Sequence, residues 1–173
     1  MCSIQLKEDL ERWYERPDPW SYECNAFDHN RKDRILKALE EHAPFDRALD
    51  VGCGEGFITR DLPAKKLYGY EISDKAAERW PENIKRVFFR NNDDRSYDLV
   101  VATGVLYKQY DHDEMRNFIL DHANGIILTS HIKSWEIPLE GIEQIYHEEF
   151  QYRDYIQVLR VFDVSGRSDY GEM

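Results

Sequence analysis

Cysteines are few in this sequence, and both metal-binding spacings and long apolar runs are absent from it. It has three cysteines among 173 residues, with no CxxC element and no closely spaced histidine pair, so no metal site is expected. An odd number of unpaired cysteines is typical of reduced thiols in the cytoplasm. No run of about 18 apolar residues is present, and the N-terminus is charged, so neither a membrane span nor a secretory signal is expected. We therefore expect a cytoplasmic protein with no membrane partner.

Positive charge is also scarce. Lysine and arginine number 23 against 34 aspartates and glutamates, which gives a net charge of -11. Such a surface repels phosphates, so no nucleic-acid partner is expected, and the acidity favours either plain solubility or a cationic ligand. The chain has no internal repeat and no Gly/Ser linker, and 42% of it is hydrophobic, which predicts a single domain over residues 1–173.

Short apolar runs alternate with helical patterns along the chain. The first 45 residues are helical or irregular, and they are interpreted as an N-terminal helical lid segment (1–45) before a cofactor-binding core (46–173). Ser73 and Asp74 are expected to cap one later helix, and Asp111 is expected to cap another. Strands are predicted at 47–51, 66–72, 84–90, 97–106 and 125–131, with a final pair near the C-terminus. The alternation predicts an α/β fold, a doubly wound Rossmann-like sheet with a parallel centre and a terminal antiparallel strand pair.

Three glycines follow the first predicted strand, in the sequence LDVGCGEGF (49–57). Glycine lets the backbone turn sharply and approach a ligand closely, and a helix is expected to follow. A dinucleotide site requires GxGxxG, but Phe57 occupies the third glycine position, which argues against an NAD-type oxidoreductase. Asp50 and Glu55 bring negative charge to the loop. Glu71, about 20 residues further on, ends the next strand, where an acid binds ribose hydroxyls. The pattern favours a nucleoside with a cationic tail, a description that S-adenosylmethionine fits.

The segments LDVGCGEG, YGYEIS and SYDLVVATGVLYKQYDHDEMRNFI resemble successive motifs of class I S-adenosylmethionine-dependent methyltransferases. This resemblance implies S-adenosyl-L-methionine as the cofactor. Asn92 or Asp93 is expected to bind the adenine amine, although Asn91 and Asp94 compete for that role in the same polar segment. The other residues that the resemblance and the lid interpretation place at the cofactor are Asp50, Gly52, Cys53, Gly54, Gly56, Glu71, Ile72, Thr103, Gly104 and Trp20.

A narrower resemblance lies ahead of the glycines. YERPDPWSYECNAFDHNRKDRIL, with GVLYKQY after the fourth predicted strand, is similar to nodulation-type methyltransferases, which N-methylate a chitooligosaccharide amine. This implies a small-molecule or glycan acceptor, with an amino sugar favoured. Trp20, Tyr22 and Phe27 could fold over the cofactor and attract its sulfonium through cation–π contact, or could simply pack against the sheet.

The acceptor chemistry is less determined by the sequence. A neutral amine needs little more than positioning, whereas a hydroxyl requires a general base. His131 and His29 are the candidate bases, Tyr107 and Tyr110 could line the acceptor pocket, and Glu136 could anchor an amine. O-methylation of a sugar or natural product remains an alternative, as does a non-catalytic protein that binds the cofactor as a partner subunit. A second copy of the chain, in a homodimer, could complete the acceptor site.

Overall fold

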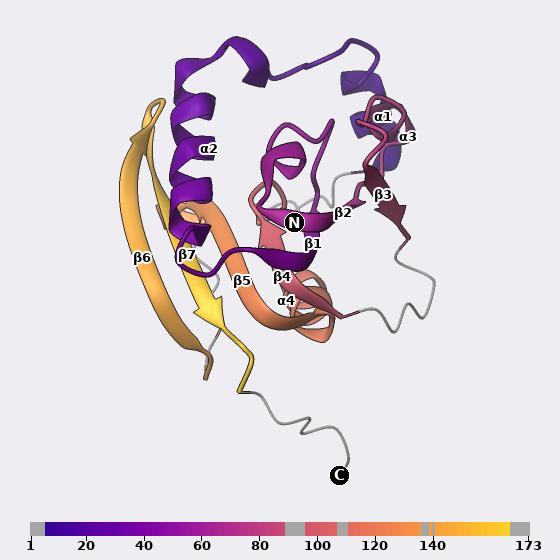
Figure 1. Ribbon diagram of the computed structural model, residues 1–173. Coiled ribbons are helices and arrows are strands. Elements are labelled where there is room, and N and C mark those ends of the chain that lie inside the picture. The colour runs from indigo at the N-terminus through magenta and orange to yellow at the C-terminus, as the bar shows by residue number, and fades with distance from the viewer. Residues whose placement is uncertain (1–5, 89–95, 107–110, 136–138, 140, 167–173) are drawn as a thin grey trace.

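The centre of the computed structural model, which describes residues 6–88, 96–106, 111–135, 139 and 141–166, is a seven-stranded sheet (Figure 1). Its strand order is β3-β2-β1-β4-β5-β7-β6. The first five strands of this order are parallel, and β7 runs antiparallel to both β5 and β6. The predicted parallel centre and terminal antiparallel pair are therefore confirmed. The strands are β1 (Phe45–Val51), β2 (Ala64–Tyr70), β3 (Ile84–Val87), β4 (Tyr97–Ala102), β5 (Ala123–Ile132), β6 (Glu143–Tyr152) and β7 (Tyr155–Asp163).

The helices are short, and two of them begin at the predicted caps. The Ser73 hydroxyl accepts the N–H of Ala76 at 3.2 Å, and the Asp111 carboxylate accepts the N–H of Glu114 at 3.0 Å. Within the described part of the chain, none of the helices has the length and apolarity needed to cross a membrane. The helices are α1 (Lys7–Trp13), α2 (Ala26–Leu39), α3 (Asp74–Ala77) and α4 (His112–His122), with 3₁₀ turns η1 (Tyr22–Cys24), η2 (Thr59–Asp61) and η3 (Lys133–Trp135).

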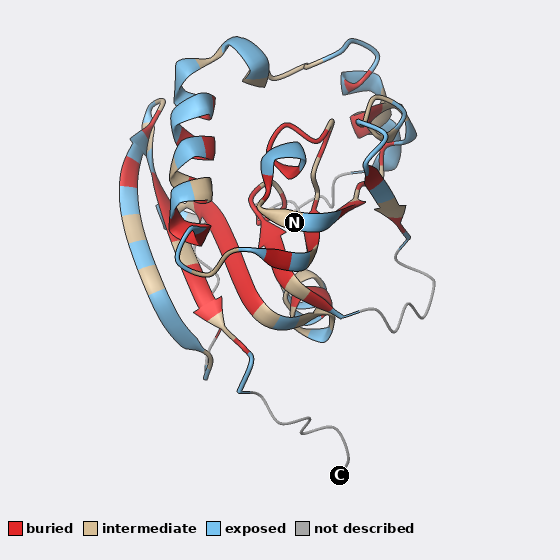
Figure 2. Cartoon of the chain, viewed as in Figure 1, coloured by how far each residue is buried: buried red, intermediate tan, exposed pale blue. Residues whose placement is uncertain are grey.

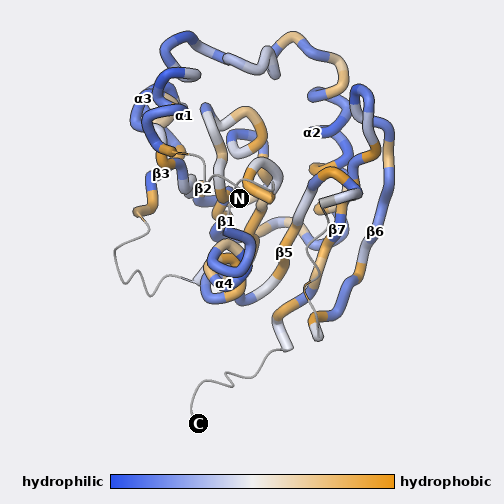
Figure 3. Tube along the Cα trace, turned by 180° about the vertical axis from the view of Figure 1, so that it is seen from behind, coloured by the Kyte–Doolittle hydropathy of each residue, from blue (hydrophilic) through white to orange (hydrophobic). Residues whose placement is uncertain are grey.

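The central strands bury both faces because successive side chains of a strand point in opposite directions. Figures 2 and 3 show buried, hydrophobic residues along these strands, whereas β6 at the edge is largely exposed. One face packs against α2, through Ala48, Leu99, Leu128, Ile35 and Leu39. The other packs against α4, through Leu49, Val100, Ile127, Phe118 and Ile119. Helices therefore cover both faces, as predicted for a doubly wound sheet.

The segment after the glycines differs from the expectation of a helix. It consists of hydrogen-bonded turns followed by the 3₁₀ helix η2, and it leads directly into β2. Pro63 explains the short length, because a residue before proline is driven out of the helical region, and Leu62 is indeed extended. Only a few residues separate the glycines from that proline, which leaves no room for two helical turns.

Three strands end at the same edge of the sheet. Asp50, near the end of β1, pairs with Gly69 of β2 on one side and with Val101 of β4 on the other. Both strands end earlier than predicted: β2 is shifted two residues toward the N-terminus and β4 is shorter, so Glu71 and Thr103 lie just beyond their ends. Because the strands are parallel, these polar residues meet at the carboxyl edge, where ligands bind in open α/β sheets.

Candidate cofactor and acceptor site

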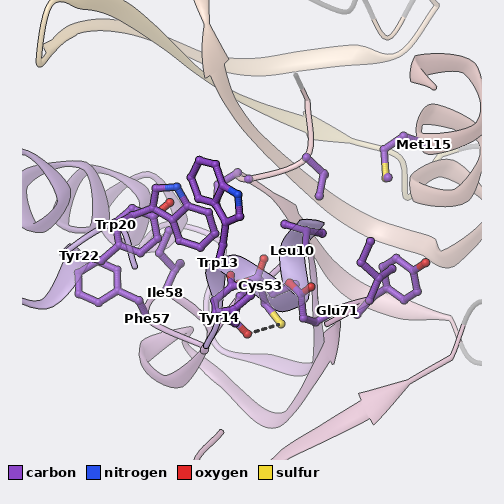
Figure 4. Close-up of a pocket in the computed structure, with 18 of the residues that line it drawn as sticks. Leu10, Trp13, Tyr14, Trp20, Tyr22, Cys53, Phe57, Ile58, Glu71 and Met115 are labelled. Atoms are coloured by element: carbon purple, nitrogen blue, oxygen red, sulfur yellow. Dashed lines mark hydrogen bonds between the residues drawn. The ribbon is translucent and has the colours of Figure 1, made fainter. Parts of the chain in front are cut away.

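A cavity of about 630 Å³ opens at this carboxyl edge, between the sheet and the N-terminal segment. Figure 4 shows the aromatic rings of Trp13, Trp20 and Tyr22 toward one end of it and Met115 at the opposite end. Its size is typical of a small-molecule or cofactor site. The lining residues are Leu10, Trp13, Tyr14, Trp20, Tyr22, Arg31, Asp50, Gly52, Cys53, Gly54, Phe57, Ile58, Tyr70, Glu71, Ile72, Thr103, Gly104, Val105, Asp111, Glu114, Met115, Arg153 and Tyr155.

The glycine loop is folded in a way that few other residues could adopt. Gly52 and Gly54 have φ values of 70° and 55°, in the left-handed region that side chains disfavour. A Cβ on Gly52 would collide with the side chain of Val105, and a Cβ on Gly54 would lie 2.6 Å from the Tyr14 hydroxyl. The loop is held to β2, because the N–H of Gly52 donates to the Tyr70 carbonyl at 2.7 Å. The glycines thus shape a tight floor for the cavity.

Glu71 is the acid at the end of β2, and it faces the cavity. One carboxylate oxygen accepts the N–H of Gly54 and the other accepts the N–H of Ser73, each at 2.9 Å. Burial raises the pKa of Glu71, and the two backbone donors partly oppose that rise. Each carboxylate oxygen has a second lone pair available for a ligand hydroxyl. The residue therefore both fixes the loop and can accept hydrogen bonds from a ribose.

Asp50 is buried at the bottom of the cavity with one oxygen unsatisfied. Its Oδ2 accepts the Thr59 hydroxyl at 2.7 Å, whereas its Oδ1 has no hydrogen-bond partner within the described residues. Burial raises the pKa of Asp50 to about 7, although Thr59 and Arg31 oppose the shift. A buried acceptor without a partner costs free energy until a donor reaches it. Asp50 is thus suited to an ammonium or hydroxyl group of a ligand, directly or through water.

Arg31 is a cavity residue that the sequence analysis missed. It projects from α2, is 4% exposed, and donates to the Thr103 carbonyl at 3.3 Å. Its guanidinium also lies 3.4 Å from the Asp28 carboxylate. A buried cation in the cavity wall can bind a carboxylate of a ligand. Asp50, in contrast, attracts a cationic group of a ligand. A signal was present, since Arg31 falls on the apolar stripe of Ile35 and Leu39 at i, i+4 and i+8.

Glu55 has a different role from the one expected. Its carboxylate accepts the N–H of Asp18 at 2.7 Å and pairs with Arg79 at 2.6 Å, and it does not line the cavity. Arg79 in turn donates to the Tyr14 carbonyl at 2.7 Å. The expected negative charge beside the ligand is therefore supplied by Asp50 and Glu71, while Glu55 ties the N-terminal segment to the glycine loop.

The remaining predicted site residues fall into three groups. Lining the cavity with Asp50 and Glu71 are Gly52, Cys53, Gly54, Ile72, Thr103, Gly104 and Trp20. Outside its lining are Gly56, His29, His131 and Phe27. Beyond the described residues lie Tyr107, Tyr110, Asn91, Asn92, Asp93, Asp94 and Glu136. The structure thus brings most of the predicted cofactor residues together and places neither candidate base in the cavity wall.

The predicted site residues that do not line the cavity make other contacts in the structure. Gly56 lies on the far side of the loop, where a Cβ would be 2.9 Å from Ile84. His29 turns away to the Glu23 carbonyl, with Nε2 at 2.8 Å. His131 is buried within β5 with Nδ1 3.1 Å from the Ile132 carbonyl, and burial lowers its pKa. Phe27 contacts the ring of Tyr152, with ring centroids 6.3 Å apart.

This fold and site define an α/β protein with a cofactor-type cavity, built from a glycine loop after β1 and an acid after β2. The chain belongs to the methyltransferase domain family, whose model matches residues 19–160, and the resemblance to methyltransferases is thereby confirmed.

Two curated relatives are similar to this chain in sequence. Nodulation protein S of Sinorhizobium fredii is 25% identical over 134 residues, covering 71% of this chain and 62% of that protein. Nodulation protein S of Rhizobium tropici is 29% identical over 118 residues, covering 62% of this chain and 50% of its own. The chain therefore spans under two thirds of the length of these curated relatives.

Two solved structures show the shared fold. The N-methyltransferase NodS from Bradyrhizobium japonicum WM9, in complex with S-adenosyl-L-homocysteine, superposes with a TM-score of 0.74 at 20% identity, covering 91% of this chain and 97% of that one. The magnesium protoporphyrin IX methyltransferase from Synechocystis PCC 6803, with bound S-adenosylmethionine, has a TM-score of 0.64 at 14% identity, covering 94% and 99%. At these sequence identities, the two comparisons show that the fold is shared.

Proposed function

We propose that this protein is an S-adenosylmethionine-dependent N-methyltransferase whose acceptor is the amine of an amino sugar in a saccharide. The carrying observation is the pair Asp50 and Glu71, two buried carboxylates that face one cavity from the ends of adjacent strands β1 and β2. Family membership and the nodulation-type relatives support the assignment.

The residues present fit this cofactor. Glu71 can accept the ribose hydroxyls, and the unsatisfied Asp50 Oδ1 can accept a donor from the amino-acid portion. The buried Arg31 provides a cation for its carboxylate. The glycines let the loop pack tightly beneath the cavity, since a Cβ on Gly54 would lie 2.6 Å from the Tyr14 hydroxyl. When bound, S-adenosylmethionine would supply a methyl group activated by its sulfonium, and the neutral thioether is the leaving group.

The protein's own contribution is positioning and exclusion of water. A neutral amine reacts once it is aligned with the methyl carbon, so orientation supplies much of the rate. Asp111 and Glu114, at the start of α4, line the cavity and add to the negative charge that favours a cationic ligand. The amine nitrogen loses a proton after forming its new bond, and a nearby carboxylate or water can take it. Residues 6–25, ahead of α2, act as a lid in this proposal, whereas α2 itself packs in the core.

The experiment measures binding and turnover separately. Calorimetry with S-adenosylmethionine and S-adenosylhomocysteine should show binding of both, and mass spectrometry should detect N-methylation of glucosamine oligomers. Binding with no transfer to amine or hydroxyl acceptors would instead indicate a non-catalytic cofactor-binding protein. Transfer only to hydroxyls would establish O-methylation, and failure to bind either cofactor form would overturn the proposal.

A further inference from the structure

Three aromatic rings form a column at the rim of the cavity. Trp13 stacks on Trp20 with ring centroids 5.4 Å apart and an angle of 25° between the rings. Trp20 stacks on Tyr22 at 6.0 Å and 16°. Figure 4 shows these rings grouped at one end of the cavity, with Trp13 nearest its centre. Trp13 lines the cavity and yet is 53% exposed, so it lies at the opening and presents indole surface to solvent.

Hydrogen bonds anchor the turn that carries Trp20, the ring on which Trp13 stacks. The Asp18 carboxylate accepts the N–H groups of Tyr22 at 2.7 Å and of Glu23 at 3.0 Å, which fixes the turn that carries Trp20. The N–H of Asp18 donates to Glu55 at 2.7 Å, which anchors the same turn to the glycine loop. A surface that is ordered before its ligand arrives loses little conformational entropy on binding.

An exposed indole face of this kind suits a sugar ring. Its apolar surface is unfavourably hydrated, and covering it recovers free energy. The negative face of the ring attracts C–H groups and ammonium groups, both of which an amino sugar presents. Arg153, in the β6–β7 turn, and Tyr155, the first residue of β7, also line the cavity and provide donors for hydroxyl groups. The site thus combines a flat apolar platform with polar side chains.

We propose that Trp13 is the stacking platform for a second sugar ring of an oligosaccharide acceptor, next to the ring whose amine is methylated. The inference rests on the proposed function for the position of the reacting amine. That amine must reach the cofactor, which the proposed function places at Asp50 and Glu71, whereas Trp13 is 53% exposed and stands at the opening. Trp13 therefore contributes to recognition of chain length, and the reacting ring is held deeper in the cavity.

Calorimetry on the full chain tests this, with S-adenosylhomocysteine, with glucosamine and with a glucosamine tetramer as separate ligands. Trp13→Ala should weaken binding of the tetramer about tenfold, the size of a single ring-stacking contact, and leave glucosamine and S-adenosylhomocysteine binding unchanged. Trp13→Phe, which keeps an aromatic face, should retain most of the tetramer affinity. Phe27→Ala is the matched control, because Phe27 is an exposed aromatic side chain on the same segment that does not line the cavity.

The outcomes separate this inference from the proposed function. Equal tetramer affinity in wild type and Trp13→Ala would overturn the inference, as would a wild type that binds S-adenosylhomocysteine but no tetramer. Equal weakening of S-adenosylhomocysteine binding would also overturn it, since Trp13 would then belong to the cofactor lid. A Trp13-dependent tetramer site in a protein that binds no cofactor would support the platform and remove the methyltransferase assignment.

Discussion

The carboxylate of Glu71 accepts a hydrogen bond from the backbone N–H of Gly54 at 2.9 Å, so the acid after β2 fixes the glycine loop after β1. Its other oxygen accepts the N–H of Ser73, at the start of α3. One side chain therefore couples two adjacent strand ends and leaves lone pairs directed at the cavity. The geometry of the loop and the affinity for a ribose are expected to depend on the same carboxylate.

Glu71→Gln should weaken both the attachment of the glycine loop and the affinity for a ribose. The amide has a single acceptor oxygen, so its NH₂ group faces one of the two backbone donors and one hydrogen bond is lost. We expect binding of S-adenosylhomocysteine to fall by roughly 1.5–3 kcal/mol, measured by calorimetry. Glu23→Gln, which alters a surface pair with Arg60 instead, is the control and should bind normally. Undiminished affinity in Glu71→Gln would show that the carboxylate does not hold the ribose.

The pH dependence of cofactor binding should report on Asp50. Its pKa is raised to about 7, mainly by burial, so its charge develops as the pH rises through neutrality. A cationic ligand binds the ionised form, and the apparent affinity for S-adenosylmethionine should therefore increase about tenfold between pH 6 and pH 8. Asp50→Asn, which can still accept the Thr59 hydroxyl, should abolish this pH dependence. An equally steep dependence in the variant would assign the titration to another group.

The contact between Gly54 and Tyr14 predicts a coupled pair of substitutions. Gly54→Ala places a methyl group 2.6 Å from the Tyr14 hydroxyl, in a backbone conformation that itself costs about 1–2 kcal/mol for a side chain. Tyr14→Phe removes that hydroxyl and leaves the nearest ring carbon at 3.8 Å. The free energy of unfolding of the double variant, measured in urea, should therefore exceed by more than about 0.5 kcal/mol the value expected if the effects of the two single substitutions simply add. Strictly additive free energies of unfolding would mean that the two residues do not meet.

Arg31 and Arg34 lie on the same helix and provide a matched comparison. Arg31 is 4% exposed and pairs with the fully buried Asp28, whereas Arg34 pairs with Glu148 at the half-buried surface. Arg31→Met should cost about 2 kcal/mol of unfolding free energy and weaken cofactor binding, since Asp28 keeps Arg153 and Tyr152 as partners but loses one buried cation. Arg34→Met should cost less than about 1 kcal/mol and leave binding unchanged. Thermal denaturation and calorimetry measure both effects, and similar losses in the two variants would refute the cavity role of Arg31.

The fold was predictable because each strand and helix cap is marked by a short run of neighbouring residues. Alternating apolar runs located the strands, and the caps at Ser73 and Asp111 lie where the sequence places them. The ends were not predictable, since β2 and β4 stop before Glu71 and Thr103 when the chain turns toward the cavity. The predicted helix after the glycines was wrong, because the proximity of Pro63 outweighs the general expectation for this fold.

The cavity itself was predictable only in part. The glycine loop and Glu71 are close in sequence to the strands that carry them, so their meeting follows from a parallel sheet. Arg31 lies on the buried stripe of α2, which a helical pattern indicates, but that Arg153 reaches the cavity from the β6–β7 turn follows from no short-range pattern. Glu55 had the correct charge for a ligand but satisfies Asp18 and Arg79 instead, which only the tertiary packing determines.

His131 provides the final prediction, because its position argues against proton transfer. It is 2% exposed, lies opposite Val158 in β7, and does not line the cavity. Burial lowers the pKa of this imidazole, which makes it a weaker proton acceptor. His131→Leu should therefore leave kcat for methyl transfer to an amine within about twofold of wild type, because removing a general base typically costs 10² or more. A hundredfold loss of kcat in a variant with unchanged cofactor affinity would instead make His131 the base, and would favour a hydroxyl acceptor.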